Sequence, residues 1–427
     1  MKISENWLRT WVNPAVDSNT LSDQLTMLGL EVDDLSPAAK PFTGVVVGEV
    51  LTVEQHPDAD RLRVTTVNIG SGEPLQIVCG APNVRVGMKA PVATIGAVLP
   101  GDFKIKKGKL RGIESQGMLC GASEIDLEDK IDGLLELPVD APVGVDIREY
   151  LNLDDHVIDI SITPNRGDCF SIRGIAREIG VINQLTVTAP EINAVAATIA
   201  DEKKVVVSTE GCPRYLGRVI KNVNTKAATP EWMERALVRS GIRQHSILVD
   251  ITNYVLMELG QPLHAFDAAK IQGSVQVRQA NTAEKLVLLN EQEVELNEKV
   301  MVIADDEKAL AIAGIMGGLS SSVTDETQDI FLESAFFAPL AIAGRARSFG
   351  LHTDASQRYE RGVDFELPML AMHRASQLIA ELAGGEFGPI TTAEQGAVLP
   401  NREAIELEQA QVDQLLGYRV DAAFIAD

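Results

Sequence analysis

The sequence has 427 residues, a hydrophobic content of 45% and a formal net charge of −23. This length exceeds what one hydrophobic core supports, so we expect about two to four domains. The negative charge excludes a nonspecific nucleic-acid coat, because such a protein repels polyanions at long range. Four cysteines lie far apart without metal-ligand spacing, which favours reduced thiols and argues against a zinc site: Cys79, Cys120, Cys169 and Cys212.

The N-terminus lacks the pattern of an export signal. Glu5 and Arg9 interrupt its apolar residues, and nowhere in the chain do eighteen apolar residues follow one another. We therefore expect a cytoplasmic protein that does not enter a membrane.

Two segments far apart in the sequence predict one interrupted domain. In residues 1–39, Ser4 is placed to cap a first helix, and leucines repeat at helical spacing in a second. Residues 150–190 contain the strand-like run V-I-D-I-S-I-T and an isoleucine-lined helix after Pro164. Because neither piece is large enough to fold alone, we expect both to build one split α/β domain.

Between these segments, residues 40–149 consist of short β-rich runs separated by turn residues, which predicts a small closed barrel. Three motifs resemble the tRNA-binding OB-fold domain of synthetases and synthetase-associated factors. They are H-P-D-A-D-R-L at 56–62, I-V-C-G-A-P-N at 77–83 and L-R-G-I-E-S-Q-G-M-L-C at 110–120. The structural alternative is that Asp58 and Asp60 only terminate a loop and that His56 is a surface histidine.

A cationic segment in this region can supply the positive charge that RNA contact needs. It carries five cations within eight residues: Lys104, Lys106, Lys107, Lys109 and Arg111. The alternative is that these side chains only protect an exposed edge strand from pairing with other chains.

Residues 191–204 are alanine-rich and then charged, which predicts a linker. Residues 205–399 alternate strand-like runs with helical patterns, the last helix running from Glu366 to Leu382, and predict an α+β domain. From residue 400 to 427 a helix begins without a closing element. We expect this to be the incomplete start of a further domain, in a fragment of a longer protein.

A polar cluster stands out within the α+β region. The otherwise apolar run 249–267 contains Asp250, Thr252, Asn253, His264 and Asp267. We expect Thr252 to cap a helix that ends at Gly260, and His264 to follow on an irregular segment, where ligand-binding residues concentrate. Metal binding by His264 and the aspartates fits no recognised zinc motif, and a catalytic triad lacks its nucleophile turn. The two aspartates are therefore expected to be structural caps.

One carboxylate, Glu333, lies inside the apolar run F-L-E-S-A-F-F at 331–337. Its burial is costly unless it is paired or awaits a hydrogen-bond donor. Arg358 is the candidate protein partner, and a ligand hydroxyl or amine is the alternative. The glycines in A-I-A-G-I-M-G-G at 311–318 lack phosphate-loop spacing, so they either let a ligand approach the backbone or form an ordinary tight turn.

Five stretches together resemble the editing domain of the bacterial phenylalanyl-tRNA synthetase β-subunit family. They are C-P-R-Y-L-G-R at 212–218, D-I-T-N-Y-V at 250–255, G-Q-P-L-H-A-F-D at 260–267, L-E-S-A-F-F at 332–337 and the arginine-rich stretch 345–364. The resemblance covers the whole chain as an N-terminal fragment. It implies a multidomain α+β protein with a split α/β N-terminal domain, an inserted OB-fold β-barrel, a B3/B4-like editing domain and the start of a B5-like domain.

The resemblance also implies an activity, the hydrolysis of mischarged tyrosyl-tRNA(Phe) by water attack on the ester. Glu333 matches the residue that receives the tyrosine hydroxyl, and His264 matches the histidine near the ester, as general base or as positioner. The other implied site residues are the polar groups Thr252 and Asn253 and the small wall residues Gly317, Gly318, Thr353 and Ala355.

The implied partners are tRNA(Phe) and the synthetase α subunit, in an α2β2 heterotetramer. No cofactor or metal is implied for this fragment. ATP and Mg2+ belong to the complete enzyme, whose aminoacylation site lies on the α subunit. Two alternatives stay open, a noncatalytic tRNA-binding scaffold with a vestigial pocket and an unrelated metal hydrolase.

Overall fold

The structure is a computed structural model that describes residues 1–127 and 132–426. Residues 128–131 of the predicted barrel domain and Asp427 lie outside this description. The chain divides into two structural units. The first unit comprises Met1–Val195, Asn222–Leu263 and His373–Gly385, and the second comprises Ala196–Lys221, His264–Met372 and Glu386–Asp427.

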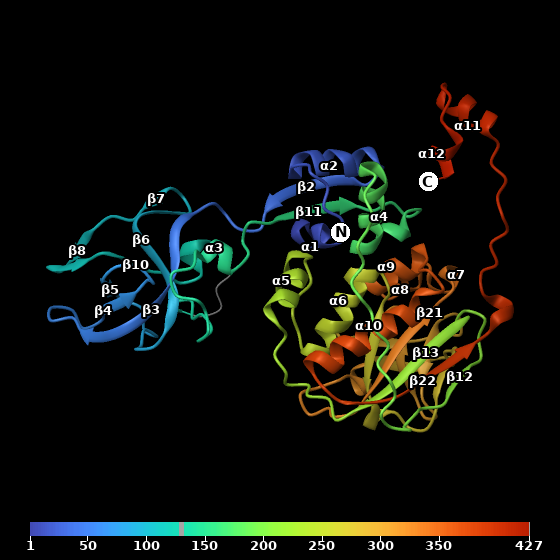
Figure 1. Cartoon of the computed structure of the whole chain (residues 1–427). Helices are drawn as coiled ribbons and strands as arrows, with labels where there is room; N and C mark the ends of the chain where they lie inside the picture. Colours follow the sequence, from blue (N-terminus) through green and yellow to red (C-terminus); the bar gives the residue numbers. More distant parts are fainter. Residues whose placement is uncertain (128–131, 427) are drawn as a thin grey trace. The chain divides into compact units, whose positions relative to one another are not determined.

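A three-stranded sheet in the first unit combines residues from both sides of the predicted insertion. Strands β1 (Lys2–Ser4) and β2 (Glu31–Pro37) pair antiparallel with the central β11 (His156–Ser161). Helices α1 (Glu5–Trp11), α2 (Ser18–Met27) and α4 (Ile172–Asn183) accompany this sheet (Figure 1). Ser4 caps α1 as predicted, by accepting a hydrogen bond from the Trp7 N–H at 3.1 Å.

A six-stranded sheet occupies the predicted barrel region. Its strands follow the order β10-β6-β3-β4-β5, with β7 also paired to β6. They are β3 (Thr43–Gln55), β4 (Arg63–Asn68), β5 (Leu75–Cys79), β6 (Lys89–Leu99), β7 (Phe103–Lys104) and β10 (Gly117–Leu119). A separate hairpin follows β7, and short helical segments complete the region: β8 (Gly108–Leu110), β9 (Ile113–Ser115), η1 (Ser123–Ile125) and α3 (Ile147–Tyr150).

The prediction of a closed barrel is wrong for the described residues, because β5 and β10 form no ladder with each other. Isolated hydrogen bonds connect β5 to the segment just before β10, two of them with Gln116 and one each with Glu114 and Ser115. The Gln116 N–H donates to the Gln76 carbonyl at 2.8 Å, and the Val78 N–H donates to the Ser115 hydroxyl at 3.1 Å. The three-residue β10 has too few backbone hydrogen-bonding groups for a continuous ladder with β5, so the two edge strands approach each other but the barrel does not close.

The remaining helices of the first unit pack around aromatic and charged side chains. They are η2 (Gly167–Cys169), α5 (Glu231–Arg239), α6 (Ile247–Leu259) and the end of α10 (Leu367–Leu382). Trp7 stacks on Tyr254 of α6 with ring centroids 4.6 Å apart. Arg374 of α10 forms a buried ion pair with Glu258 of α6, with nitrogen–oxygen distances of 2.7 and 2.9 Å.

The second unit contains two main sheets and a hairpin. One sheet has the order β14-β21-β13-β22, formed by β13 (Arg214–Lys221), β14 (Leu263–Asp267), β21 (Ile330–Phe336) and β22 (Glu386–Glu394). The other has the order β12-β15-β18-β19-β20, formed by β12 (Val205–Val207), β15 (Val275–Gln279), β18 (Met301–Ala304), β19 (Ala309–Ile312) and β20 (Met316–Gly317). The hairpin is β16 (Lys285–Val287) with β17 (Glu293–Glu295).

Short helices complete the second unit. They are η3 (Ala268–Lys270), η4 (Leu319–Ser321), α7 (Pro339–Ile342), α8 (Arg345–Ser348), α9 (Asp354–Arg361), η5 (Gly396–Val398), α11 (Gln409–Leu416) and α12 (Ala422–Ala426). A mixed core fills the unit, with aliphatic side chains from both main sheets packed around Phe266, Phe331 and Phe337. Across residues 1–127 and 132–426, no helix has the length and apolarity to cross a bilayer.

Candidate functional site

The helix that carries Thr252 and Asn253 begins earlier than expected. Helix α6 starts at Ile247 and ends at Gly260, whose φ of 89° provides the predicted left-handed stop. Thr252 is not the N-cap, so that prediction is wrong. Its hydroxyl donates to the Val249 carbonyl at 2.8 Å, in the turn before it. Ile247 and Leu248 extend the helix backwards because their burial outweighs the capping preference of threonine.

The two aspartates beside this helix have structural partners, as predicted. Asp250 is buried and accepts hydrogen bonds from the His245 N–H at 2.9 Å and the Thr229 hydroxyl at 2.6 Å. Asp267 is the N-cap of η3 and accepts from the Thr327 hydroxyl at 2.9 Å. These contacts explain both carboxylates without a ligand.

Glu333 lies in the middle of β21, inside the four-stranded sheet. The register of β21 with β13 places Glu333 opposite Gly217 and Ala335 opposite Tyr215. Residues directly opposite one another, and those two positions along, point to the same face of a sheet. Glu333 and Tyr215 therefore share one face, although they are distant in sequence.

The Glu333 side chain is almost completely buried. The residue is only 5% exposed, and burial raises the pKa of its carboxyl to about 8, with the Tyr215 hydroxyl as a smaller, opposing influence. Within the described residues its Oε2 atom is buried without a hydrogen-bonded partner. Arg358, considered as a partner, donates to the carbonyl and carboxylate of Asp354 at 2.9 and 3.0 Å. Glu333 is therefore protonated near pH 7 and has hydrogen-bonding capacity left.

His264 lies on β14 with its ring against Gly317. A Cβ atom at Gly317 would lie 2.5 Å from the His264 Cε1 atom, so only glycine fits beside this ring. Phe266 contacts the same ring edge-on, with centroids 4.4 Å apart. Burial lowers the pKa of the imidazole to about 4, and its Nε2 atom is buried without a partner in the described part of the chain. His264 is therefore neutral near pH 7, with one ring nitrogen available.

The glycines of the 311–318 stretch serve the packing of the protein itself. Gly317 leaves space for the His264 ring. Gly318 lies against β19, where a Cβ atom would approach the Leu310 carbonyl oxygen to 2.5 Å. The sequence suggested that these glycines either let a ligand approach the backbone or form a tight turn. Neither explanation accounts for their close contacts with other protein atoms.

The other predicted wall residues lie at the start of α9. Thr353 is the N-cap and forms a capping box with Ser356. Its hydroxyl also donates to the Ile315 carbonyl at 2.9 Å, which links α9 to the segment before β20. Ala355 follows in the first turn and is half-buried. His264, Glu333 and the wall residues belong to the second unit, whereas Thr252 and Asn253 belong to the first.

The cationic segment borders a cavity of about 550 Å³ beside the six-stranded sheet. Lys104 and Lys106 contribute to its lining. Lys107 forms an ion pair with Glu114 at 2.6 Å. Lys109 belongs to β8, and Arg111 follows that strand with a positive φ of 44°. The five cations therefore have different surroundings, and only two face the cavity.

His56 is not the surface histidine considered as an alternative, because it is only 2% exposed. Its Nδ1 atom accepts a hydrogen bond from the Asp58 N–H at 3.1 Å. The Nε2 atom, 3.1 Å from the Leu110 carbonyl, is therefore the protonated nitrogen and donates to it. His56 thus joins the 56–62 motif to the 110–120 motif, a contact that sequence reasoning missed.

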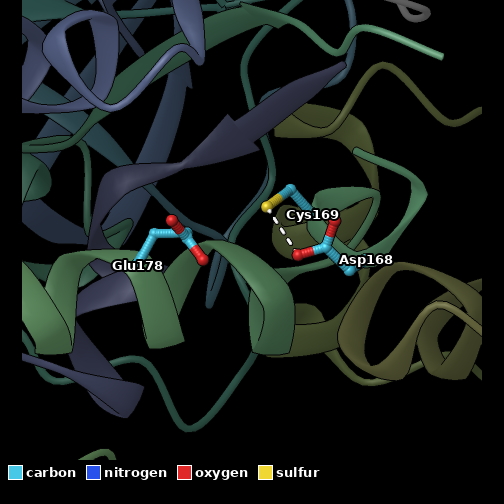
Figure 2. Close-up of side chains that lie close together, drawn as sticks. All are labelled: Asp168, Cys169 and Glu178. Carbon is cyan, nitrogen blue, oxygen red and sulfur yellow. Dashed lines mark hydrogen bonds between the residues drawn. The ribbon is translucent and has the colours of Figure 1, made fainter. Parts of the chain in front are cut away.

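Asp168, Cys169 and Glu178 form the only group within the described residues whose ligand atoms are close enough together to hold a metal ion (Figure 2). Arg166 already occupies this cluster. Its guanidinium donates to both Asp168 oxygens at 3.1 Å and lies 2.9 Å from Glu178. Burial raises the pKa of the Cys169 thiol to about 12, so the sulfur is protonated. The cluster is explained as a salt-bridge network around an arginine.

Comparisons with known proteins show what this chain is similar to. The family described as "B3/4 domain" matches residues 211–384, and the one described as "Putative tRNA binding domain" matches residues 45–146. The chain is 81% identical over its full length to the phenylalanine–tRNA ligase beta subunit of Acinetobacter baylyi, of which it covers 54%. Over 99% of its length it is 62% identical to the subunit of the same name from Psychrobacter arcticus, of which it covers 53%.

Among solved structures, an N-terminal fragment of the phenylalanyl-tRNA synthetase beta subunit from Pyrococcus horikoshii matches 64% of this chain and 75% of that fragment. Its sequence identity of 15% and TM-score of 0.32 support no conclusion about the fold. The chain spans about half the length of the curated relatives it matches. The resemblance expected from the sequence motifs is confirmed: the chain is similar over its whole length to about half the length of the phenylalanine–tRNA ligase beta subunits that it matches.

Proposed function

We propose that this chain binds tRNA(Phe) and hydrolyses tyrosyl-tRNA(Phe), as the editing part of a phenylalanine–tRNA ligase. The observation that carries the proposal is Glu333, a buried carboxyl with a raised pKa and an unpartnered Oε2 atom. A buried polar group without a partner is costly, so its presence inside an apolar strand requires a reason. Recognition of a ligand hydroxyl supplies that reason.

Tyrosine and phenylalanine differ by one hydroxyl group, which a protonated Glu333 can recognise. A neutral carboxyl both donates and accepts hydrogen bonds, as a phenol does. With phenylalanine in the same place, the carboxyl would stay unpaired at a cost of about 1–3 kcal/mol. This corresponds to a preference for tyrosine of roughly five- to 150-fold.

At the other end of the substrate, we assign His264 to the position of the attacking water. The water oxygen bonds to the ester carbonyl carbon and loses a proton, the bond from that carbon to the ribose oxygen breaks, and the ribose oxygen gains the proton that the water lost. An imidazole with a pKa of about 4 is a weak base near pH 7, which favours His264 as a positioner of water over His264 as general base. We assign Gly317, Gly318, Thr353 and Ala355 to the wall beside the side chain.

The domain organisation supports a division of labour within a larger enzyme. We propose a split N-terminal domain at residues 1–39 and 150–190, with the tRNA-binding domain at 40–149 inserted in it. A linker at 191–204 then leads to the editing domain at 205–399, and a further domain begins at 400–427. Aminoacylation, with its ATP and Mg2+, is assigned to the α subunit of the complete α2β2 enzyme.

The test is deacylation of tyrosyl-tRNA(Phe) and phenylalanyl-tRNA(Phe) by the 427-residue chain and its variants. Glu333→Ala should lower tyrosyl-tRNA hydrolysis about ten- to hundredfold, whereas Glu333→Gln, which keeps a neutral donor and acceptor, should retain more. His264→Ala should lower the rate without removing tRNA binding. The exposed carboxylate Glu298, changed to alanine, is the matched control and should leave the rate unaltered.

Three outcomes would contradict the proposal. Tyrosyl-specific hydrolysis that survives both Glu333→Ala and His264→Ala would remove the residue assignment. Binding of tRNA without hydrolysis of either substrate at saturating protein would favour the alternative of a noncatalytic scaffold. Loss of activity on treatment with a chelator would instead indicate a metal hydrolase.

A further inference from the structure

The cavity beside the cationic segment is built from the motifs that resemble tRNA-binding domains. The lining includes Cys79 to Pro82 of the second motif and, from the third, Ser115 and the segment Gly117 to Leu119. Its volume of about 550 Å³ is within the range of pockets that enclose small organic ligands, roughly 300–1,000 Å³. The first motif supports it indirectly, because His56 holds the Leu110 carbonyl.

Phe103 forms part of the cavity wall and is 59% exposed. It begins the short strand β7, pairing with Leu99, whereas Ile105 just after that strand is buried. A single exposed hydrophobic residue is common on protein surfaces. Phe103 is unusual because it lines a cavity that two lysines, Lys104 and Lys106, also line.

Charge is divided across this site. Lys104 and Lys106 line the cavity and have no ion-pair partner within residues 1–127 and 132–426. The acidic residues Glu124 and Asp132 line it too, and Glu124 accepts a hydrogen bond from the Gly121 N–H at 2.8 Å. A phosphate is attracted to the lysines and repelled by the carboxylates, while an uncharged ring can lie beside either.

We propose that this cavity binds an unpaired nucleotide of RNA, with its base stacked on the Phe103 ring and its phosphates beside Lys104 and Lys106. The ligand class rests on the proposed function, in which RNA is a partner. Aromatic rings and cations in one groove are the common means of binding single-stranded nucleic acid, because each base offers a flat face. A base inside a duplex cannot reach the ring, since its faces are covered by neighbouring bases.

The carboxylates give this site a chemical preference. Glu124 and Asp132 can accept hydrogen bonds from the exocyclic amino groups of adenine, cytosine and guanine, but uracil has none. Bases with an amino group should therefore bind more tightly than uracil. His56 acts as a positioning residue, because it fixes the carbonyl of Leu110 at the edge of the cavity.

The experiment measures binding of the 427-residue chain to labelled RNA by fluorescence anisotropy. Three labelled ligands are compared: tRNA(Phe), a short single-stranded oligoribonucleotide, and the same oligonucleotide with abasic sites; unlabelled duplex RNA of the same sequence serves as a competitor. Phe103→Leu, which removes the aromatic face but keeps an apolar side chain, should weaken binding of the single strand about five- to 150-fold. Phe103→Trp should retain binding, and its fluorescence should be quenched by the stacked base. Val86→Ala, at a 61% exposed apolar residue outside the cavity lining, is the control and should bind as wild type does.

The salt dependence separates stacking from charge. Phe103→Leu should lower the affinity without changing the slope of log affinity against log salt, because no phosphate contact is lost. Lys106→Gln should reduce that slope by about 0.7 for one phosphate on a single strand. Equal effects of both changes on the slope would overturn the assignment of Phe103 to the base.

Three results would overturn the proposal. The affinity of Phe103→Leu for the single strand could equal that of wild type. Phe103→Leu could weaken binding of the abasic strand as much as binding of the intact strand, or duplex RNA could compete as well as single-stranded RNA. Absence of RNA binding by the wild-type chain would overturn it as well. RNA binding that depends on Phe103, without deacylation, would support this site and contradict the editing proposal. Deacylation together with RNA binding that does not depend on Phe103 would support the editing proposal and contradict this site.

Discussion

The raised pKa of Glu333 should make the stability of the second unit depend on pH. The folded protein binds this proton more tightly than the unfolded chain, with a pKa of about 8 against an ordinary value of 4.5. The resulting stabilisation is complete below pH 4.5 and is lost as the pH rises through 8. At about 1.4 kcal/mol for each pH unit between these values, the predicted loss from pH 5 to pH 9 is roughly 4 kcal/mol.

A variant that cannot ionise isolates this contribution. Glu333→Gln keeps the size and polarity of the protonated side chain, so its stability should lack the Glu333 component of the pH dependence. Neighbouring groups do not titrate in the same window. Burial raises the pKa of Cys212 and of Tyr215 well above their ordinary values, and the pKa of His264, about 4, lies below pH 5.

The assay must observe the second unit. All three tryptophans, Trp7, Trp11 and Trp232, lie in the first unit, so their fluorescence does not report on β21. Hydrogen exchange of β21 amides at increasing urea concentration measures the free energy of unfolding locally. Parallel curves for wild type and Glu333→Gln from pH 5 to pH 9 would refute the reasoning, because they would show that Glu333 is already ionised at pH 5 or has a partner.

Three further changes test other contacts. Arg374→Met should destabilise the first unit by about 3–5 kcal/mol, because it leaves the buried Glu258 unpaired, and replacing both residues by apolar ones should recover most of this loss in urea unfolding. Gly260→Ala should lower the free energy of unfolding by about 1–2 kcal/mol, because alanine disfavours the left-handed φ at the end of α6, and Gly260→Asn should cost less. Lys107→Gln should weaken RNA binding less than Lys106→Gln, because Lys107 is already paired with a carboxylate, and equal losses by anisotropy would contradict this ranking.

The sequence predicted most elements whose signals are local. The Ser4 cap, the strand at Val157 to Ser161, the helix end at Gly260 and the helix ending at Leu382 all occur as expected. Each depends on neighbouring residues through capping, alternation or helical spacing. Local signals also caused an error, since the preference of Thr252 for a cap competed with the burial of the apolar residues before it.

Features that depend on contacts between distant residues could not be predicted. The prediction of a closed barrel was wrong because the spacing of strands along the sequence does not indicate how many residues of the last strand can pair with the first edge strand. Tyr215 lies within a quoted motif, yet only the register of β13 with β21 places it on the face of Glu333. The same applies to His56 and Leu110, whose hydrogen bond joins two separate motifs. Sequence reasoning identified the chemical groups, and the fold determined their neighbours.

The neutral state of Glu333 sets a limit on what the proposed site can achieve. A buried carboxylate without a partner would destabilise the strand far more than a neutral carboxyl, so protonation lets the fold persist when no hydroxyl is bound. The same protonation reduces the penalty for phenylalanine to that of one unsatisfied neutral group, about 1–3 kcal/mol. Discrimination by this contact alone is therefore bounded near a hundredfold.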